Sequence, residues 1–270
     1  MGRLNKALER IQSRDIDYNV KSRGGVTKME SESQVDQGTD LFNLETPITH
    51  LDQDHLAARR IVTAETDPSV RTAYKMLRTR ILQTMRTNGW NSLAITSAGQ
   101  GDGKTLTAIN LAISLAGDVN HHVCLVDLDM KRSSVAKYLG IEAEKGISDC
   151  LKNESTLKNI IVKPDIERLY IAPNVTVEDQ TSELLASPEM RHTASELIQN
   201  PNRIIVYDMP PVLAADDMLA FSPYVDAILV VVAEGITPRT DAMKVRELLA
   251  DMNVIGTLLN RSDEKTAAYY

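Results

Sequence analysis

Apolar and polar positions follow a regular pattern from about residue 68 onward. Short runs rich in Val, Ile and Leu, typical of buried strands, are separated by segments in which apolar residues recur every three or four positions, as in helices with one buried face. The runs predict strands over residues 91–97, 122–128, 167–172, 203–208, 225–232 and 254–259. The periodic segments predict helices over residues 69–87, 104–117, 133–139, 147–152, 180–199 with a break at Pro188, 213–221 and 238–251. This alternation predicts an α/β fold with a mostly parallel, twisted sheet and helices on both faces.

The pattern is different before this region. Apolar residues at helical spacing opposite charged ones predict a short amphipathic segment within residues 1–21, which could dock on a partner or a membrane surface or could be an ordinary helix that packs back on the domain. Residues 22–60 are polar with few aromatic side chains, and they predict a flexible linker. We therefore expect the folded domain over residues 61–262 and a flexible tail over residues 263–270.

Composition narrows the class of protein. The 270 residues are 43% hydrophobic, which fits one α/β domain with additional terminal segments. The net charge of −7 gives no general electrostatic support for nucleic-acid binding, so no nucleic-acid partner is expected. The apolar run Ala227–Ala233 is far shorter than the roughly 20 residues that cross a bilayer, and no apolar signal-peptide core follows Met1. A cytoplasmic protein is therefore expected, and Cys124 and Cys150 are predicted to be reduced core residues.

A glycine-rich segment, Thr96–Thr105, joins the first of these strands to the following helix. In this context backbone N–H groups surround phosphate oxygens, the helix N-terminus adds a positive dipole and Lys104 adds a full charge. The predicted phosphate-binding residues are Gly99, Gln100, Gly101, Asp102, Gly103, Lys104, Thr105 and Leu106. Ala98 stands where the strict G-x-x-x-x-G-K-[ST] pattern has its first glycine, and a plain glycine-rich turn is the alternative. We expect this phosphate loop to bind ATP or GTP with Mg²⁺.

Carboxylates follow two further strands at the same predicted sheet edge. Asp127 and Asp129 lie on the same side of the chain and could share a metal or divide metal and base duties, whereas a solvated loop start is the alternative. Asp208 ends another apolar strand and is the candidate for a Mg²⁺ carboxylate. Pro210 follows closely and makes the chain leave the sheet there. Asn260, at the end of the last strand, could contact a purine base or could be a turn residue.

These motifs together resemble the bacterial tyrosine autokinases, or BY-kinases, which regulate capsule and exopolysaccharide assembly. The similar segments are Ser97–Thr105, Val126–Arg132, Ser182–Pro188, Val206–Leu213 and Ser222–Asp226. The likeness extends over about residues 68–262. It implies a P-loop NTPase fold and ATP-dependent phosphorylation of tyrosines at the C-terminus of a neighbouring subunit. The matching acceptors are Tyr269 and Tyr270, although an accidental aromatic C-terminus is the alternative.

The resemblance also implies roles for the site residues. Mg²⁺ would be held by Thr105, Asp129 and Asp208, and Lys104 would neutralise charge as the phosphoryl group moves. Asp127 would orient or deprotonate the tyrosine hydroxyl.

The family further implies partners. Phosphorylation in trans requires a transient homo-oligomer, a separate membrane polysaccharide co-polymerase would activate the kinase and recruit it to the inner membrane, and a tyrosine phosphatase would reverse the modification. The family's ring-assembly motif, an acid and two arginines at three-residue spacing, aligns with Thr72, Lys75 and Arg78. Loss of the acid removes half of an intersubunit ion pair, which argues against a closed ring. A solvated basic helix face is the alternative.

Two other functions stay open at this point. A ParA- or MinD-like ATPase switch would bind ATP without phosphorylating protein, but Ala98 stands where such proteins have a signature lysine. A catalytically weak nucleotide sensor that gates a membrane co-polymerase, with the tail as a docking tag, is the third candidate.

Overall fold

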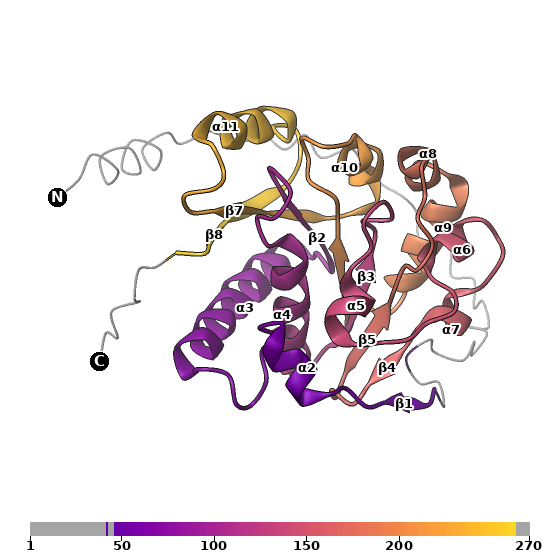
Figure 1. Cartoon of the computed structure of the whole chain (residues 1–270). Helices are drawn as coiled ribbons and strands as arrows, with labels where there is room; N and C mark the ends of the chain where they lie inside the picture. Colours follow the sequence, from indigo (N-terminus) through magenta and orange to yellow (C-terminus); the bar gives the residue numbers. More distant parts are fainter. Residues whose placement is uncertain (1–41, 43–45, 263–270) are drawn as a thin grey trace, which may run out of the picture. The chain divides into compact units, whose positions relative to one another are not determined.

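The computed structural model describes Phe42 and residues 46–262 (Figure 1). The predicted amphipathic segment within residues 1–21 lies outside the described residues, as does the tail with Tyr269 and Tyr270. Among the described residues, no helix combines the length and the apolar character that crossing a bilayer requires.

The domain is built on a six-stranded sheet in which every neighbouring pair of strands is parallel. In spatial order the strands are β5 (Leu169–Ala172), β3 (His122–Asp127), β6 (Arg203–Asp208), β2 (Ser92–Ser97), β7 (Ala227–Ala233) and β8 (Val254–Asn260). The predicted α/β class is therefore confirmed. Because all six strands run the same way, their carboxyl ends meet at one edge, where α/β proteins bind ligands.

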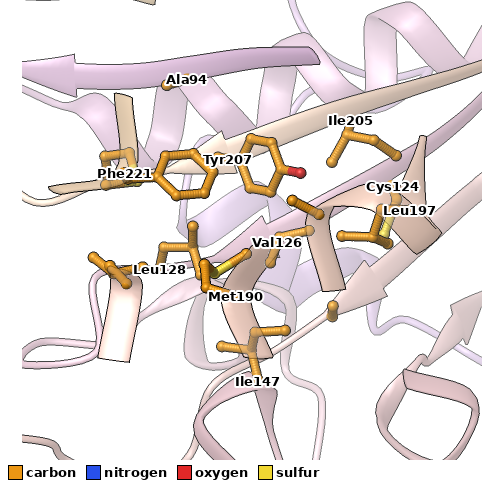
Figure 2. Packing of buried hydrophobic residues seen from close by; sticks show 14 of the residues in the cluster. Ala94, Cys124, Val126, Leu128, Ile147, Met190, Leu197, Ile205, Tyr207 and Phe221 are labelled. Atoms are coloured by element: carbon orange, nitrogen blue, oxygen red, sulfur yellow. The ribbon is translucent and has the colours of Figure 1, made fainter. Parts of the chain in front are cut away.

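Helices cover both faces of the sheet (Figure 1). One face packs against α2 (Gln53–Ala58), α3 (Pro68–Asn88), α4 (Lys104–Ala116) and α5 (Val135–Leu139). The other packs against α6 (Ile147–Leu151), α7 (Leu157–Ile160), α8 (Thr181–Leu185), α9 (Pro188–Leu197), α10 (Asp217–Phe221) and α11 (Arg239–Leu248). Because successive side chains of a strand point to opposite faces of the sheet, Leu93 and Ile95 pack against the first helical layer and Ala94 packs against the second. Figure 2 shows the second cluster, in which Val126 and Tyr207 from the strands pack with Met190 and Phe221 from the helices.

The chain before residue 61 differs from the sequence prediction. Ile48–Thr49 forms β1, which pairs in parallel with β4 (Lys163–Pro164), and α2 follows it. Leu51 and Leu56 are buried in the core on the α2–α5 face. The linker predicted over residues 22–60 is therefore wrong for the part from β1 through α2, because its few apolar side chains pack on the domain.

Two predicted helical stretches are also shorter or divided. The stretch over residues 180–199 is split into α8 and α9, since Ser187 caps the second helix by accepting a hydrogen bond from Met190 N–H and Pro188 occupies its first position. The helix predicted from residue 213 begins only at Asp217. Val212 N–H donates to Ser97 O, so the chain stays beside the phosphate loop before it can turn into α10.

Candidate nucleotide-binding and catalytic site

The phosphate loop connects the end of β2 to the start of α4. Gly101 and Gly103 have φ angles of +81° and +95°, a region that glycine adopts without strain. Asp102 stabilises the loop, because its carboxylate accepts a hydrogen bond from Gly99 N–H at 2.9 Å and another from Thr237 Oγ1, outside the loop, at 2.9 Å. The first N–H groups of α4 have no acceptor inside the helix and can bind an anion.

Residues from outside the loop hold its backbone in place. Asn260 Nδ2 donates to Asp102 O at 2.8 Å, and Arg261 Nη2 donates to Gly101 O at 2.8 Å. The end of β8 therefore supports the phosphate loop. Asn260 also lines the cavity described below, so its contact with a base stays a prediction alongside this structural contact.

The ends of three strands bring the predicted catalytic groups together. Thr105 Oγ1 donates to Asp208 Oδ2 at 2.6 Å. Lys104 Nζ lies 2.7 Å from Asp129 Oδ2 and 3.4 Å from Asp208 Oδ1. Asp127 and Asp208 are register partners on the neighbouring strands β3 and β6. Lys104, Thr105 and the three carboxylates thus form one cluster at the carboxyl edge of the sheet.

Asp127 has a different environment from Asp129. Its carboxylate accepts hydrogen bonds from the N–H groups of Asp129 at 3.2 Å, Ser134 at 3.0 Å and Val135 at 3.0 Å. The side chain is fully buried, so its oxygens hold the loop that carries Asp129. Direct contact between Asp127 and an incoming hydroxyl would require this loop to move.

The cluster carries more negative than positive charge. Burial, reinforced by the neighbouring Asp208, raises the pKa of Asp127 to about 7. Burial also raises the pKa of Asp208, although Lys104 and Thr105 oppose that shift. Burial lowers the pKa of Lys104, but the carboxylates of Asp208 and Asp129 outweigh it and leave that pKa above its usual value. The Thr105 hydroxyl and the carboxylates of Asp129 and Asp208 are oxygen ligands of the kind that Mg²⁺ prefers. Within the described part of the chain, however, no three acidic, histidine or cysteine side chains are arranged as a metal site by themselves, so a cation here would also need oxygens from the nucleotide or from water.

A cavity of about 1250 Å³ opens in front of this cluster. Its walls come from the phosphate loop, the loop after β3, Pro210 and Pro211 after β6, the end of β8, and the segment between α2 and α3. Leu106, predicted to contact a phosphate, lies in the same wall as Tyr74 and Asn110. The volume is large enough for a nucleotide and part of a second molecule.

Several residues of the site carried no sequence signal. Ser134 Oγ donates to Thr105 Oγ1 at 3.4 Å, and Thr237 reaches Asp102 from a loop after β7. Asn174 Nδ2 donates to Ser133 Oγ at 2.7 Å and supports the loop after β3. These contacts join residues far apart in the sequence, and none belongs to a local motif.

The three positions aligned with the ring-assembly motif lie on α3. Thr72 and Lys75 are exposed. Arg78 is half-buried, and its Nη1 donates to Ser114 O near the end of α4 at 2.9 Å. One of the motif's two cationic positions is therefore bonded within the domain.

This architecture, with a phosphate loop between the central strand β2 and α4, defines a P-loop nucleotide-binding α/β protein. The family model of the AAA domain matches residues 91–257, and the chain belongs to that family. Among curated proteins, the chain is 28% identical over 206 residues to the tyrosine-protein kinase YwqD of Bacillus subtilis, covering 75% of this chain and 86% of that protein. It is 26% identical over 226 residues to the putative tyrosine-protein kinase EpsB of Ralstonia nicotianae, covering 82% of this chain but only 29% of that protein. The resemblance to bacterial tyrosine kinases predicted from the motifs is confirmed.

Solved structures share the fold of this chain. The crystal structure of the chimerical protein CapA2B2 matches with a TM-score of 0.70 at 25% identity, covering 80% of this chain and 95% of that one. The septum site-determining protein MinD of Pyrococcus horikoshii, complexed with Mg-ADP, matches with a TM-score of 0.55 at 24% identity, covering 65% of this chain and 72% of that one. The second likeness extends to the fold alone.

Proposed function

We propose that this chain is an ATP-dependent protein tyrosine kinase that phosphorylates the C-terminal tyrosines of a second copy in trans, and that it regulates the polymerisation and export of an exopolysaccharide or capsule. The observation that carries the proposal is the meeting of Lys104, Thr105, Asp129 and Asp208 beside one cavity at the phosphate loop. The names of the relatives support the choice of tyrosine as acceptor.

The proposed mechanism assigns a task to each group. The phosphate loop would bind the phosphates through its N–H groups, and Thr105, Asp129 and Asp208 would hold Mg²⁺. When bound, ATP supplies the phosphoryl group and Mg²⁺ offsets its charge. Lys104 would leave its present carboxylate partners in part and stabilise charge on the transferred group. Most of the acceleration is then electrostatic, since loose phosphoryl transfer needs little base catalysis.

The acceptor tyrosine would enter through the open side of the cavity, next to Asp129. A phenol with a pKa near 10 is a weak nucleophile while protonated, so a nearby carboxylate helps to orient its hydroxyl. Asp127 remains the proposed base, and a shift of the loop from Asp129 to Val135 would expose it. The acceptors would be Tyr269 and Tyr270.

The partners follow from the proposal. We expect a transient homo-oligomer, a separate membrane co-polymerase or activator that brings the protein to the inner membrane, and a tyrosine phosphatase. If a pull-down from membranes with the full chain recovers no polysaccharide-export protein, the proposed activator is contradicted.

Incubation of the purified full chain with labelled ATP and Mg²⁺ tests the activity. The kinase produces phosphotyrosine on the tail, and this label is lost in the Lys104→Met variant. The double variant Tyr269→Phe, Tyr270→Phe loses the tail label but keeps nucleotide binding. Release of free phosphate without phosphotyrosine would instead support the MinD-like switch, and neither product would support the nucleotide sensor.

A further inference from the structure

Four exposed cationic side chains line the mouth of the cavity: Arg60, Lys131, Arg132 and Arg261. Arg60 follows α2, Lys131 and Arg132 belong to the loop after β3, and Arg261 follows β8. The acidic residues in the same wall are Asp129, which is paired with Lys104, and the exposed Glu65. A local positive surplus therefore surrounds the mouth in a chain whose net charge is −7.

The contacts of these cations leave most of their charge uncompensated. Arg132 donates to the neutral side chain of Gln100, and Arg261 donates to the carbonyl of Gly101. Lys131 has a favourable electrostatic interaction with the buried Asp217. Within the part of the chain that the structure describes, none of the four lies within ion-pair distance of a carboxylate.

The backbone at Arg60 is fixed against the helix that follows the phosphate loop. Asn110 of α4 is 2% exposed, and its amide donates to Arg60 O at 3.1 Å and accepts from Val62 N–H at 2.8 Å. Arg60 itself has a positive φ of 61°. This pair of hydrogen bonds holds Arg60 at the cavity wall.

In the proposed complex the phosphates of the nucleotide would lie on the N–H groups of the loop and on Lys104. The four exposed cations line the same cavity, and among the described residues Arg60 and Lys131 have no hydrogen bond to the phosphate loop. We propose that this cationic mouth binds acidic side chains that flank the acceptor tyrosine, so that the preferred substrate is an acidic tyrosine segment. This inference rests on the proposed kinase function.

The chain's own tail carries two acidic side chains before its tyrosines. Asp263 and Glu264 precede Tyr269 by six and five residues, and Lys265 follows them. Five extended residues span roughly 17 Å, so the acidic pair would lie well outside the position of the reacting hydroxyl. Exposed charge pairs contribute little one by one, so the four cations would act together and their effect would fall with salt.

Two peptides and the full-length protein test the proposal. One peptide reproduces residues 262–270, and the other carries Asp263→Asn and Glu264→Gln. At saturating ATP, we expect kcat/KM for the acidic peptide to exceed that for the neutral one about 3- to 10-fold, with the ratio approaching one at about 0.5 M salt. The double variant Arg60→Gln, Lys131→Gln is expected to lose the preference. Lys158→Gln, an exposed change on α7, is the matched control and should keep it.

The outcomes separate this inference from the proposed function. Equal phosphorylation of both peptides by the unchanged protein overturns the acidic preference and leaves the kinase proposal standing. If the double variant raises KM for ATP but leaves the ratio of kcat/KM between the two peptides unchanged, the cations bind the nucleotide instead, and the acidic preference is again overturned. If neither peptide is phosphorylated, the kinase proposal fails. In that case, fluorescence anisotropy of the labelled peptides tests the binding preference of the cationic mouth. Tighter binding of the acidic peptide supports the preference, and equal binding of both peptides overturns it.

Discussion

Tyr207 lies on β6 immediately before Asp208, and its side chain is buried in the cluster shown in Figure 2. Its ring packs edge-on against Phe221, with 4.7 Å between the ring centroids. Its hydroxyl has no hydrogen-bond partner among the described residues. A buried hydroxyl without a partner loses its bonds to water and gains none in return, so Tyr207 carries a desolvation cost.

We therefore expect Tyr207→Phe to stabilise the protein by about 1 kcal/mol. The change removes the unpaired hydroxyl and keeps the ring. The shift in denaturant midpoint at constant slope measures the effect. Tyr170→Phe is the matched control, because the Tyr170 hydroxyl donates to Phe42 O and its loss should destabilise the fold. Destabilisation by Tyr207→Phe would mean that its hydroxyl has a favourable interaction after all.

The two glycines of positive φ in the phosphate loop allow a second test at this scale. A Cβ on Gly103 would lie 2.0 Å from Asn260 Nδ2, whereas a Cβ on Gly101 would meet nothing within 4 Å. Gly101→Ala should cost only the backbone strain of about 1 kcal/mol. Gly103→Ala should destabilise the protein further and weaken nucleotide binding, because it displaces either the loop or Asn260. Thermal unfolding and nucleotide titration measure the two effects.

A double-mutant cycle with Asn260→Ala separates strain from collision. In the Asn260→Ala background, Gly103→Ala should cost about as much as Gly101→Ala does in the unchanged protein. If the two glycine substitutions lower the stability equally in the presence of Asn260, Asn260 does not contact the phosphate loop as described.

At the residue level, the phosphate-loop motif singled out Lys104 and Thr105, and the end of an apolar strand singled out Asp208. The sequence predicted that they would lie at the same edge of the sheet, because the carboxyl ends of parallel strands share an edge, and the structure brings them together there. The sequence could not predict that the oxygens of Asp127 face the N–H groups of Ser134 and Val135. That orientation depends on the path of the loop after β3, and no periodic pattern encodes it.

At the scale of elements, one set of hydrogen bonds links the segment after β5 to the loop that carries Asp129. Asn174 is buried, accepts from Ser148 N–H at 3.1 Å, and donates to Ser133 Oγ and to Thr176 O. Ser133 Oγ in turn donates to Asp129 O at 3.2 Å. Glu178 N–H adds a hydrogen bond to Met130 O at 3.1 Å. The segment between β5 and α8 thus helps to position the loop that carries Asp129.

Asn174→Asp keeps the acceptor for Ser148 and removes both donors at unchanged size. We expect turnover to fall about ten-fold and the Mg²⁺ requirement to rise, as for other residues that orient a metal-binding group. Metal-free nucleotide binding, which depends on the phosphate loop, should change little. Asn159→Asp, on the exposed surface of α7, is the control. Loss of metal-free binding or of the fold in Asn174→Asp would indicate a general structural role instead.

The predictability of the elements followed their length and periodicity. The long apolar strands and α3 and α4 have enough residues for a clear period, and they were predicted to within a few residues. The two-residue strand β1 and the six-residue helix α2 are too short to show such a period. Their positions depend on Leu51 and Leu56 packing against the domain, which a polar composition conceals.

At the scale of the whole molecule, the site depends on distant parts of the chain meeting at one edge. The phosphate loop, the loops after β3 and β6, and the end of β8 all contribute to the same cavity. The sequence predicted this gathering from the parallel sheet. It did not predict the wall formed by the segment between α2 and α3, because that segment was assigned in part to a linker.

The proposed phosphorylation in trans would require two copies to meet, and the exposed face of α3 bears on how they would do so. The motif that holds family rings pairs an acid with arginines, but this chain has Thr72 and Lys75, and Arg78 is bonded to Ser114 O. We therefore expect the protein to be monomeric by light scattering at micromolar concentration, even with nucleotide and Mg²⁺. The rate of tail phosphorylation per molecule should then rise in proportion to protein concentration, since each event needs a collision.

Restoring the missing acid should change this behaviour. The double variant Thr72→Glu, Lys75→Arg recreates the acid and one arginine on the same helix face, where residues three apart are neighbours. We expect it to form a larger species by light scattering and to phosphorylate its tail at a rate less dependent on concentration. The control variant Thr87→Glu adds the same charge at an exposed position near the end of α3, far along the helix from Thr72 and Lys75, and this variant should remain monomeric. A closed ring of the unchanged protein would contradict the expectation, because assembly would then proceed without the acidic partner and through a surface other than this ion pair.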